Sequence, residues 1–212
     1  MRVLAIDTTS DFGSLALHED GVTIEELPLH STEGFSQILF PQIERLLQRH
    51  DWPLSSIGIF AAASGPGSFT GVRVGLTAAK GLADALGRGA AGVSNLKALA
   101  SCGTQRTRGV VMDARRGEVY AAVYDSDLQI VSPEAVTPFQ RWIASTPKPD
   151  EILSPDFSAF RPNLPWEIPV IERRALAAAI ARIAEATGPS DPALLDANYV
   201  RRSDAELLWK DK

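Results

Sequence analysis

Four polar residues in a row, Asp7-Thr8-Thr9-Ser10, directly follow the short apolar run 3–6. Their types suit phosphate chemistry, because hydroxyl groups and backbone amides in a turn after a strand can hold a phosphate, and a carboxylate there can position a metal ion or water. The same residue types also suit a turn that satisfies only its own backbone. The sequence therefore offers Asp7, Thr8, Thr9 and Ser10 as a candidate phosphate loop and leaves the purely structural interpretation open.

A glycine-rich stretch, residues 65–71, precedes a helical pattern. A glycine-rich turn before a helix can surround an anion with backbone amides. The stretch is not a Walker A loop, because no Gly-Lys-Ser/Thr follows, and it is not a dinucleotide fingerprint, because Thr70 stands three positions after Gly67 where that motif has glycine. The missing lysine favours a tight turn that packs the helix against a sheet, with an anion site as the alternative.

The sequence gives little support for a nucleophilic hydrolase or for a zinc site. Ser68 lies outside a Gly-x-Ser-x-Gly elbow. The three histidines, His18, His30 and His50, lack the His-Glu-x-x-His spacing of zinc hydrolases. The single cysteine, Cys102, can form neither an internal disulfide nor a Cys-rich zinc site. We therefore expect no metal site in this chain.

Two adjacent arginines, Arg115 and Arg116, lie between Asp113 and Glu118 in a predicted hairpin. A hairpin tip of this kind can contact an anion or a partner protein. A solvated tip with local ion pairs explains the same residues equally well.

The hydrophobic patterns of the first half predict alternating strands and helices that position these residues. Ser36 is the expected N-cap of the first helix, which would place Pro41 beyond the first turn and kink the helix. The expected elements are an antiparallel meander of strands at 3–7, 14–18 and 22–27, a helix over 35–49, a buried strand at 57–63, a helix over 70–86, a strand at 89–93, and a short helix that Ser94 caps and that ends near Cys102. This order is typical of the ribonuclease-H-like α/β domain of the actin-like ATPase (ASKHA) superfamily.

The second half gives a weaker pattern and looks incomplete. We expect one complete lobe at residues 1–102 and a reduced lobe at 103–212, whose tail packs back on the first. The expected elements are a polar linker at 103–108, hairpin strands at 109–113 and 118–124, a helix over 138–145, a proline-rich loop at 147–169 with one strand at 151–153, a helix over 174–186 and a short helix at 193–195.

Composition limits the kinds of partner. The 212 residues carry 21 Lys and Arg against 26 Asp and Glu, a net charge of −5, which does not favour autonomous nucleic-acid binding. No apolar stretch approaches the roughly 20 residues of a membrane span. We expect a cytoplasmic protein.

Four sequence blocks, in this order, resemble the TsaB family of bacterial tRNA threonylcarbamoyladenosine biosynthesis proteins, which are sometimes called glycoprotease-like. The resemblance covers about residues 1–125, and beyond them only Asn198-Tyr199-Val200-Arg201 is similar to the terminal Tyr-Leu-Arg of that family. The blocks are Ile6-Asp7-Thr8-Thr9, Ser64-Gly65-Pro66-Gly67-Ser68-Phe69-Thr70-Gly71-Val72-Arg73-Val74-Gly75, Gly92-Val93-Ser94, and Asp113-Ala114-Arg115-Arg116-Gly117-Glu118-Val119-Tyr120.

The resemblance implies a non-catalytic paralogue of the catalytic subunit TsaD. That subunit holds a metal with a His-x-x-x-His pair on its first long helix, whereas residues 31–49 of this chain contain no histidine. The family therefore implies no catalytic residue and no required cofactor in this chain, with ATP and metal belonging to partner subunits.

The resemblance also implies partners. TsaB-type proteins pair with TsaD through helices of the N-terminal domain, form homodimers through the same surface, recruit the ATPase TsaE, and meet tRNA only indirectly. The apolar positions of the two long helices fit either this role or a core. The expected interface is Phe35, Ile38, Leu39, Ile43, Phe69, Val72, Arg73 and Leu76; the other family-motif residues are Gly65, Gly67, Ser68, Thr70, Gly71, Asp113, Arg115 and Glu118. The alternative, an autonomous ATP-dependent kinase-like enzyme or a peptidase, rests on residues 7–10 and on the family label.

Overall fold

The computed structural model describes residues 1–200, and Arg201, the last residue of the block that is similar to the family's terminal motif, lies outside them. Two compact units divide the chain. Unit 1 contains Met1–Ala98 and Arg174–Ala197, and unit 2 contains Leu99–Arg173 together with residues 198–200. The segment 174–197 thus belongs to unit 1 although it lies in the second half of the sequence.

Unit 1 is built on a five-stranded sheet with the order β3-β2-β1-β4-β5. The first three strands form the predicted antiparallel meander, and β4 and β5 run parallel to β1. Every residue of β4 is buried, as expected of a strand that is apolar from Ile59 to Ala63 and covered on both faces. The bounds are β1 Arg2–Asp7, β2 Phe12–Glu19, β3 Val22–His30, β4 Ile59–Gly65 and β5 Gly89–Ser94.

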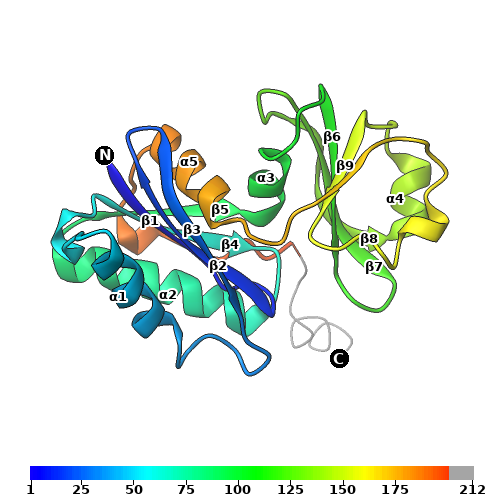
Figure 1. The fold of residues 1–212 in the computed structure, drawn as a ribbon. Helices are drawn as coiled ribbons and strands as arrows, with labels where there is room; N and C mark the ends of the chain where they lie inside the picture. The colour runs from blue at the N-terminus through cyan, green and yellow to red at the C-terminus, as the bar shows by residue number, and fades with distance from the viewer. Residues whose placement is uncertain (201–212) are drawn as a thin grey trace. The chain divides into compact units, whose positions relative to one another are not determined.

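Helices cover both faces of this sheet (Figure 1). Helices α1 (Leu39–Arg49) and α2 (Phe69–Leu86) lie on one face, and α5 (Ala177–Thr187) packs on the other against β1 and β2. Shorter elements are η1 (Leu54–Ser56), α3 (Asn95–Ala100), which Ser94 caps as expected, and η3 (Pro192–Leu194).

The start of α1 differs from the prediction. The helix begins at Leu39 with Ile38 as its N-cap, so the expected N-cap Ser36 is wrong. Pro41 consequently lies in the first turn, where backbone N–H groups make no hydrogen bond within the helix. The proline therefore removes no helical hydrogen bond, and the kink expected at Pro41 has no physical reason to form. Helix α2 begins one residue earlier than predicted, because the Ser68 side chain accepts a hydrogen bond from the Gly71 amide.

The last helix of unit 1 is fixed to the hairpin between β2 and β3. The Nε2 atom of the buried His18 lies 2.9 Å from Glu185 Oε2 on α5, and the Gly21 amide donates to the same oxygen at 2.8 Å. The Met1 amino group lies 3.6 Å from the other Glu185 oxygen and also pairs with Asp20. Glu185 therefore joins three segments of unit 1 through one carboxylate.

Unit 2 contains a second five-stranded sheet with the order β10-β9-β6-β7-β8. Taken in chain order, its first strand is central, the next two form an antiparallel meander on one side, and the last two are parallel to the first on the other side. The two sheets share one topology. The bounds are β6 Thr107–Asp113, β7 Glu118–Asp125, β8 Ile130–Pro138, β9 Glu151–Ser154 and β10 Val170–Glu172.

The reduction of unit 2 affects its helices, not its sheet. Between β8 and β9 it has the 7-residue α4 (Phe139–Ser145), and between β9 and β10 only η2 (Arg161–Asn163), where unit 1 has helices of 11 and 18 residues. The sequence did not predict β8 and β10, because β8 is a mostly exposed edge strand with little hydrophobic alternation and β10 has three residues. No helix within residues 1–200 is both long and apolar enough to cross a membrane.

Candidate functional site

The loop after β1 is held by hydrogen bonds within unit 1. Asp7 Oδ1 accepts from the Thr9 amide at 3.0 Å and from the Thr9 hydroxyl at 2.7 Å. Asn95, at the start of α3, donates to the Thr9 hydroxyl at 2.8 Å and accepts from the Gly65 amide at 3.0 Å. The buried residues Asp7, Thr9 and Asn95 therefore join the ends of three parallel strands.

Burial sets the protonation behaviour of Asp7. Loss of hydration raises the pKa of this carboxyl above its ordinary value. Hydrogen bonds from Thr9 and Asn95 oppose the shift, and the nearby negative charge of Glu26 adds to it. The bonds that hold the carboxylate thus only partly offset the cost of removing it from water.

The glycine-rich stretch lies directly against this loop. The Ser68 amide donates to the Thr9 carbonyl at 2.7 Å, and the Thr8 hydroxyl donates to the Gly71 carbonyl at 2.7 Å. A Cβ atom added at Gly67 would lie 2.6 Å from the Thr9 carbonyl oxygen, and one at Gly71 would overlap the Thr8 carbonyl. Both glycines are needed because two backbone segments approach closely here. This close approach is what the tight-turn interpretation of the glycine-rich stretch requires.

The side-chain hydroxyls that the sequence offers to a phosphate already donate to protein oxygens in this arrangement. The hydroxyls of Thr8 and Thr9 donate to protein oxygens, and the Ser10 hydroxyl donates to the Phe12 carbonyl at 2.8 Å. A phosphate at these side chains would have to replace the bonds that hold the loop. The phosphate-loop role of Asp7, Thr8, Thr9 and Ser10 stays a prediction; in the structure Thr8 joins the loop to α2, Thr9 joins it to α3, and Ser10 bonds within the loop.

A groove runs between α1 and α2 and encloses a cavity of about 500 Å3. Two phenylalanines at its rim are solvent-exposed: Phe40 keeps 52% of its surface accessible and Phe69 keeps 49%. The Arg73 guanidinium lies 3.8 Å from the centroid of the Phe69 ring. Exposed aromatic rings and an arginine beside a concave surface are typical of protein-binding sites.

The eight residues expected at a partner interface divide into two groups. Phe69 and Arg73 are exposed at the groove, and Ile38 is partly buried. The other five are buried in the core of unit 1, with at most 7% of their surface accessible: Phe35, Leu39, Ile43, Val72 and Leu76. Four of them, Leu39, Ile43, Val72 and Leu76, have the helical spacing of the core-facing stripes of α1 and α2.

Phe40 was missed by sequence reasoning. It directly follows the buried Leu39, so it lies beside the apolar stripe, at the groove and exposed to solvent. The sequence signal that could have identified Phe40 as a surface residue is a large aromatic side chain outside the core-facing stripe of an amphipathic helix.

The hairpin between β6 and β7 has an unusual turn. Arg115, Arg116 and Gly117 are consecutive left-handed residues, with φ of 66°, 57° and 76°. A left-handed conformation costs a non-glycine residue about 1–2 kcal/mol. Asp113 accepts from the Arg115 amide at 2.7 Å, in the same way that Asp7 accepts from the amide two residues later. Glu118 closes the turn by donating its amide to the Arg115 carbonyl at 3.0 Å.

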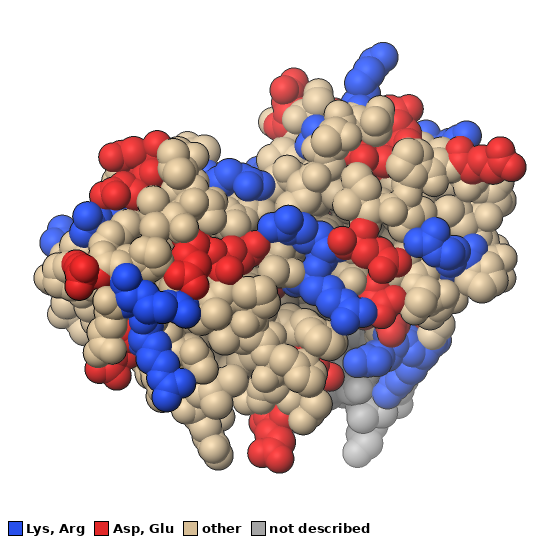
Figure 2. Space-filling view, in the orientation of Figure 1, with Lys and Arg blue, Asp and Glu red and all other residues tan. Residues whose placement is uncertain are grey.

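Within residues 1–200 no cluster of three or more His, Cys, Asp or Glu side chains is arranged to hold a metal ion. On the face drawn in Figure 2, basic and acidic side chains are interspersed.

The family model described as "TsaD: tRNA N6-adenosine threonylcarbamoyltransferase" matches residues 21–187. The chain is 40% identical over 132 residues to the tRNA threonylcarbamoyladenosine biosynthesis protein TsaB of Escherichia coli K12, covering 60% of this chain and 56% of that protein. It is 36% identical over 126 residues to the Bacillus subtilis 168 protein of the same name, covering 58% and 55%. The matched part thus spans about half the length of these relatives.

Solved structures extend the similarity to nearly the whole chain. A Pseudomonas aeruginosa protein described as similar to the peptidase YeaZ superposes with a TM-score of 0.80 at 26% identity, covering 94% of this chain and 99% of that one. A structure described as YeaZ from the same organism gives a TM-score of 0.80 at 25% identity, covering 93% and 99%. The repeated five-stranded topology and these neighbours define an α/β protein of the ASKHA type. The order of the glycine-rich and Asp-Ala-Arg-Arg-Gly-Glu blocks narrows the class further, and the chain belongs to the TsaB family.

Proposed function

We propose that this chain is a non-catalytic scaffold and activator subunit for threonylcarbamoyl transfer to the adenosine beside the tRNA anticodon. It pairs with a catalytic subunit of the TsaD type and helps to recruit the ATPase TsaE. Membership of the TsaB family supports the pathway, since the curated relatives are named for the biosynthesis of this modified nucleoside.

The groove between α1 and α2 is the observation that carries the partner role. Phe40 and Phe69 leave about half of their surfaces in water beside a concave cavity. Covering the exposed half of each ring would contribute about 1 kcal/mol. The partner that fits is the catalytic subunit, with a second copy of this chain occupying the same groove when that subunit is missing.

Arg73 gives this surface a specific polar contact. Its guanidinium stacks on the Phe69 ring at the groove, so a positive charge lies beside the exposed aromatic surface. We expect the partner to place an apolar side chain in the cavity and a carboxylate near Arg73.

ATP, metal and tRNA enter the reaction through the partner subunits. The mixed surface charge in Figure 2 and the net charge of −5 suit a protein that contacts tRNA only indirectly. The hydroxyl groups of residues 8–10 serve the fold of unit 1, which supports a role without nucleotide chemistry of its own.

Reconstitution tests the proposal. The cognate TsaD-type subunit, TsaE, tRNA and the threonylcarbamoyl adenylate are combined with or without this chain, and the modified nucleoside is quantified. We expect modification only when the chain is present. Equal modification without it would contradict the scaffold role, and calorimetry showing tight binding of ATP and magnesium to the isolated chain would support the kinase-like alternative.

A further inference from the structure

The turn between β4 and α2 presents the first residues of α2 to the groove between α1 and α2. Phe69 and Thr70, at the start of the helix, line that groove. Phe69 leaves about half of its surface in water, so the position of its ring depends mainly on the backbone that carries it. The groups that hold this backbone therefore shape the surface that is offered to a partner.

One buried amide side chain, that of Asn95, bonds two of the backbone segments that meet at this turn. Its Oδ1 atom accepts from the Gly65 amide at 3.0 Å, at the end of β4. Its Nδ2 atom donates to the Thr9 hydroxyl at 2.8 Å, in the loop after β1. Because Asn95 is fully buried, removing its side chain would leave the Gly65 amide and the Thr9 hydroxyl without these bonds inside the protein.

The loop after β1 in turn holds the start of α2. The Ser68 amide donates to the Thr9 carbonyl at 2.7 Å, and Ser68 is the N-cap of α2. The Thr8 hydroxyl donates to the Gly71 carbonyl at 2.7 Å, in the first turn of the helix. Hydrogen bonds therefore connect Asn95 through Thr9 to the residue that directly precedes the groove wall.

The two bonds of Asn95 require an amide side chain. One atom must accept from a backbone N–H while another donates to a hydroxyl, and an amide supplies both. Aspartate would lose the donor and would place a second carboxylate beside the buried Asp7. Asn95 is also the first residue of α3, so the same side chain joins the start of α3 to the turn before α2.

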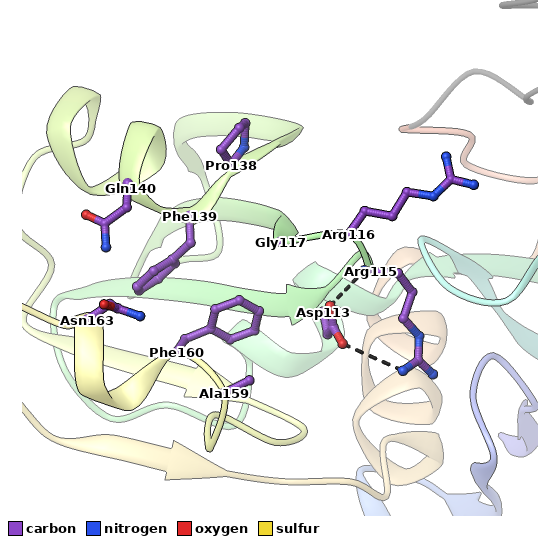
Figure 3. Close-up of a pocket in the computed structure, with 10 residues that line it drawn as sticks. All are labelled: Asp113, Arg115, Arg116, Gly117, Pro138, Phe139, Gln140, Ala159, Phe160 and Asn163. Atoms are coloured by element: carbon purple, nitrogen blue, oxygen red, sulfur yellow. Dashed lines mark hydrogen bonds and ion pairs between the residues drawn. The ribbon is translucent and has the colours of Figure 1, made fainter.

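Unit 2 shows that the loop after the first strand does not by itself need a buried amide. Its sheet has the same topology, and Asp113 follows β6 as Asp7 follows β1. In Figure 3 the hydrogen bond and the ion pair of Asp113 are both with Arg115, and these two side chains are 43% and 83% exposed. Unit 2 has no long helix at the place of α2, which indicates that Asn95 serves α2 and its groove.

We propose that Asn95 is a positioning residue for the groove between α1 and α2. It acts through Thr9 and Ser68 and holds the start of α2 where Phe69 meets the catalytic subunit. Coupling of this kind is reciprocal, so a subunit bound in the groove stabilises the start of α3. The inference rests on the proposed function, and it assigns a role in partner binding to a residue that is not part of the groove surface.

The first test compares Asn95→Ala with the control variant Ser14→Ala. Ser14 is also fully buried in unit 1, and its hydroxyl oxygen accepts from the Leu176 and Ala177 amides at 3.1 and 3.0 Å, at the start of α5. Each variant therefore removes a buried side chain with two hydrogen bonds, but α5 lies on the face of the sheet away from the groove (Figure 1).

The Kd for the TsaD-type subunit is measured by calorimetry, and the stability of unit 1 by hydrogen exchange of β1. We expect both variants to lose protection in β1 to a similar extent. Asn95→Ala should bind the subunit at least about fivefold more weakly, because fewer chains hold the groove in its binding form. Ser14→Ala should bind within about twofold of the parent. Equal affinities of the two variants would overturn the inference.

The second test uses the parent chain, so it does not depend on the folding of a variant. Hydrogen exchange is compared with and without the TsaD-type subunit. We expect binding to slow exchange at residues 94–98 and to leave residues 176–180 unchanged, and the slowing at 94–98 should be lost in Asn95→Ala. Unchanged exchange at 94–98 in the bound parent would overturn the inference. A parent chain that does not bind the subunit would contradict the proposed function itself, and this inference with it.

Discussion

Replacing Gly71 and Gly81 by alanine, one at a time, should change the stability of unit 1 in opposite directions. Both glycines lie in α2, so the two variants make the same chemical change in the same helix. Gly81 has no atom within 4 Å of an added Cβ, whereas at Gly71 that atom would overlap the Thr8 carbonyl. Whether alanine stabilises or destabilises unit 1 therefore depends on whether the replaced glycine is in close contact with a neighbouring backbone.

The magnitudes follow from these surroundings. Gly81→Ala gains helix propensity and should raise the free energy of unfolding by about 1 kcal/mol, or Tm by roughly 2–4 °C. At Gly71 the same gain is opposed by overpacking against a backbone atom, which costs about 1–3 kcal/mol. The hydrogen bond from the Thr8 hydroxyl to the Gly71 carbonyl, worth about 1 kcal/mol, would also be strained. We expect a net loss of about 2 kcal/mol.

The assay must report on unit 1 itself, because two units can unfold separately. Hydrogen exchange of the amides of β1 and α2, measured by mass spectrometry, gives the local free energy of opening. Protection should rise in Gly81→Ala and fall in Gly71→Ala, with β6 and β7 unchanged in both. A Gly71→Ala protein as stable as the parent would refute the close approach of the two loops.

The remaining predictions concern buried and charged groups. Leu39→Glu and Val72→Glu each place a charge in the core of unit 1 and should lower the free energy of unfolding of unit 1 by at least about 3 kcal/mol. We expect circular dichroism to show loss of soluble folded protein, and normal folding of either variant would contradict the burial of Leu39 and Val72. Burial raises the pKa of Glu185, but the hydrogen bonds from the Gly21 amide and His18 outweigh burial, so the pKa is lowered overall. The Glu185 carboxylate therefore contributes its full stabilisation above the unfolded-state pKa, and this contribution disappears as the pH falls through the folded-state pKa. Denaturation curves of the parent and Glu185→Gln should therefore differ at neutral pH and converge in acid, whereas a constant gap would exclude this origin. In unit 2, Glu151 Oε1 accepts from the Thr104 and Gln105 amides at 2.7 and 2.8 Å, so Glu151→Gln should cost about 1–3 kcal/mol and reduce exchange protection in β6 and β9 but not in β1.

The fold of unit 1 was largely predictable because its strands and helices have strong, distinct periodicities. The all-apolar run 57–63 predicted the buried strand β4, which pairs with the central strand β1. The start of α1 was not predictable in the same way, since Ser36 is a good N-cap by type, yet no side chain caps the helix at Ile38. Unit 2 was harder, because its edge strands depend on pairing with β7 and β9, which a local pattern does not reveal.

The candidate interface shows a limit of periodicity. An apolar stripe with helical spacing identifies the face that is buried first, and in α1 and α2 that face packs on the sheet. The partner surface that we propose instead uses exposed apolar residues outside the stripe, such as Phe40, or at a helix start, such as Phe69. The left-handed conformation of Arg115 and Arg116 could not be predicted either, because their residue types disfavour it.

The most direct test of the central claim is the modification assay with the double variant Phe40→Asp/Phe69→Asp. Both positions lie in the first turn of a helix, where aspartate is compatible with the helix dipole, so the chain should fold normally. The control Val22→Asp/Ile130→Asp adds the same charge at apolar residues that are 59% and 62% exposed elsewhere. We predict that the groove variant binds the TsaD-type subunit at least about 30-fold more weakly than the parent chain does. At subunit concentrations below the Kd of the variant, it should no longer stimulate tRNA modification. The control should behave as the parent in both measurements. Full stimulation by a folded groove variant would contradict the account.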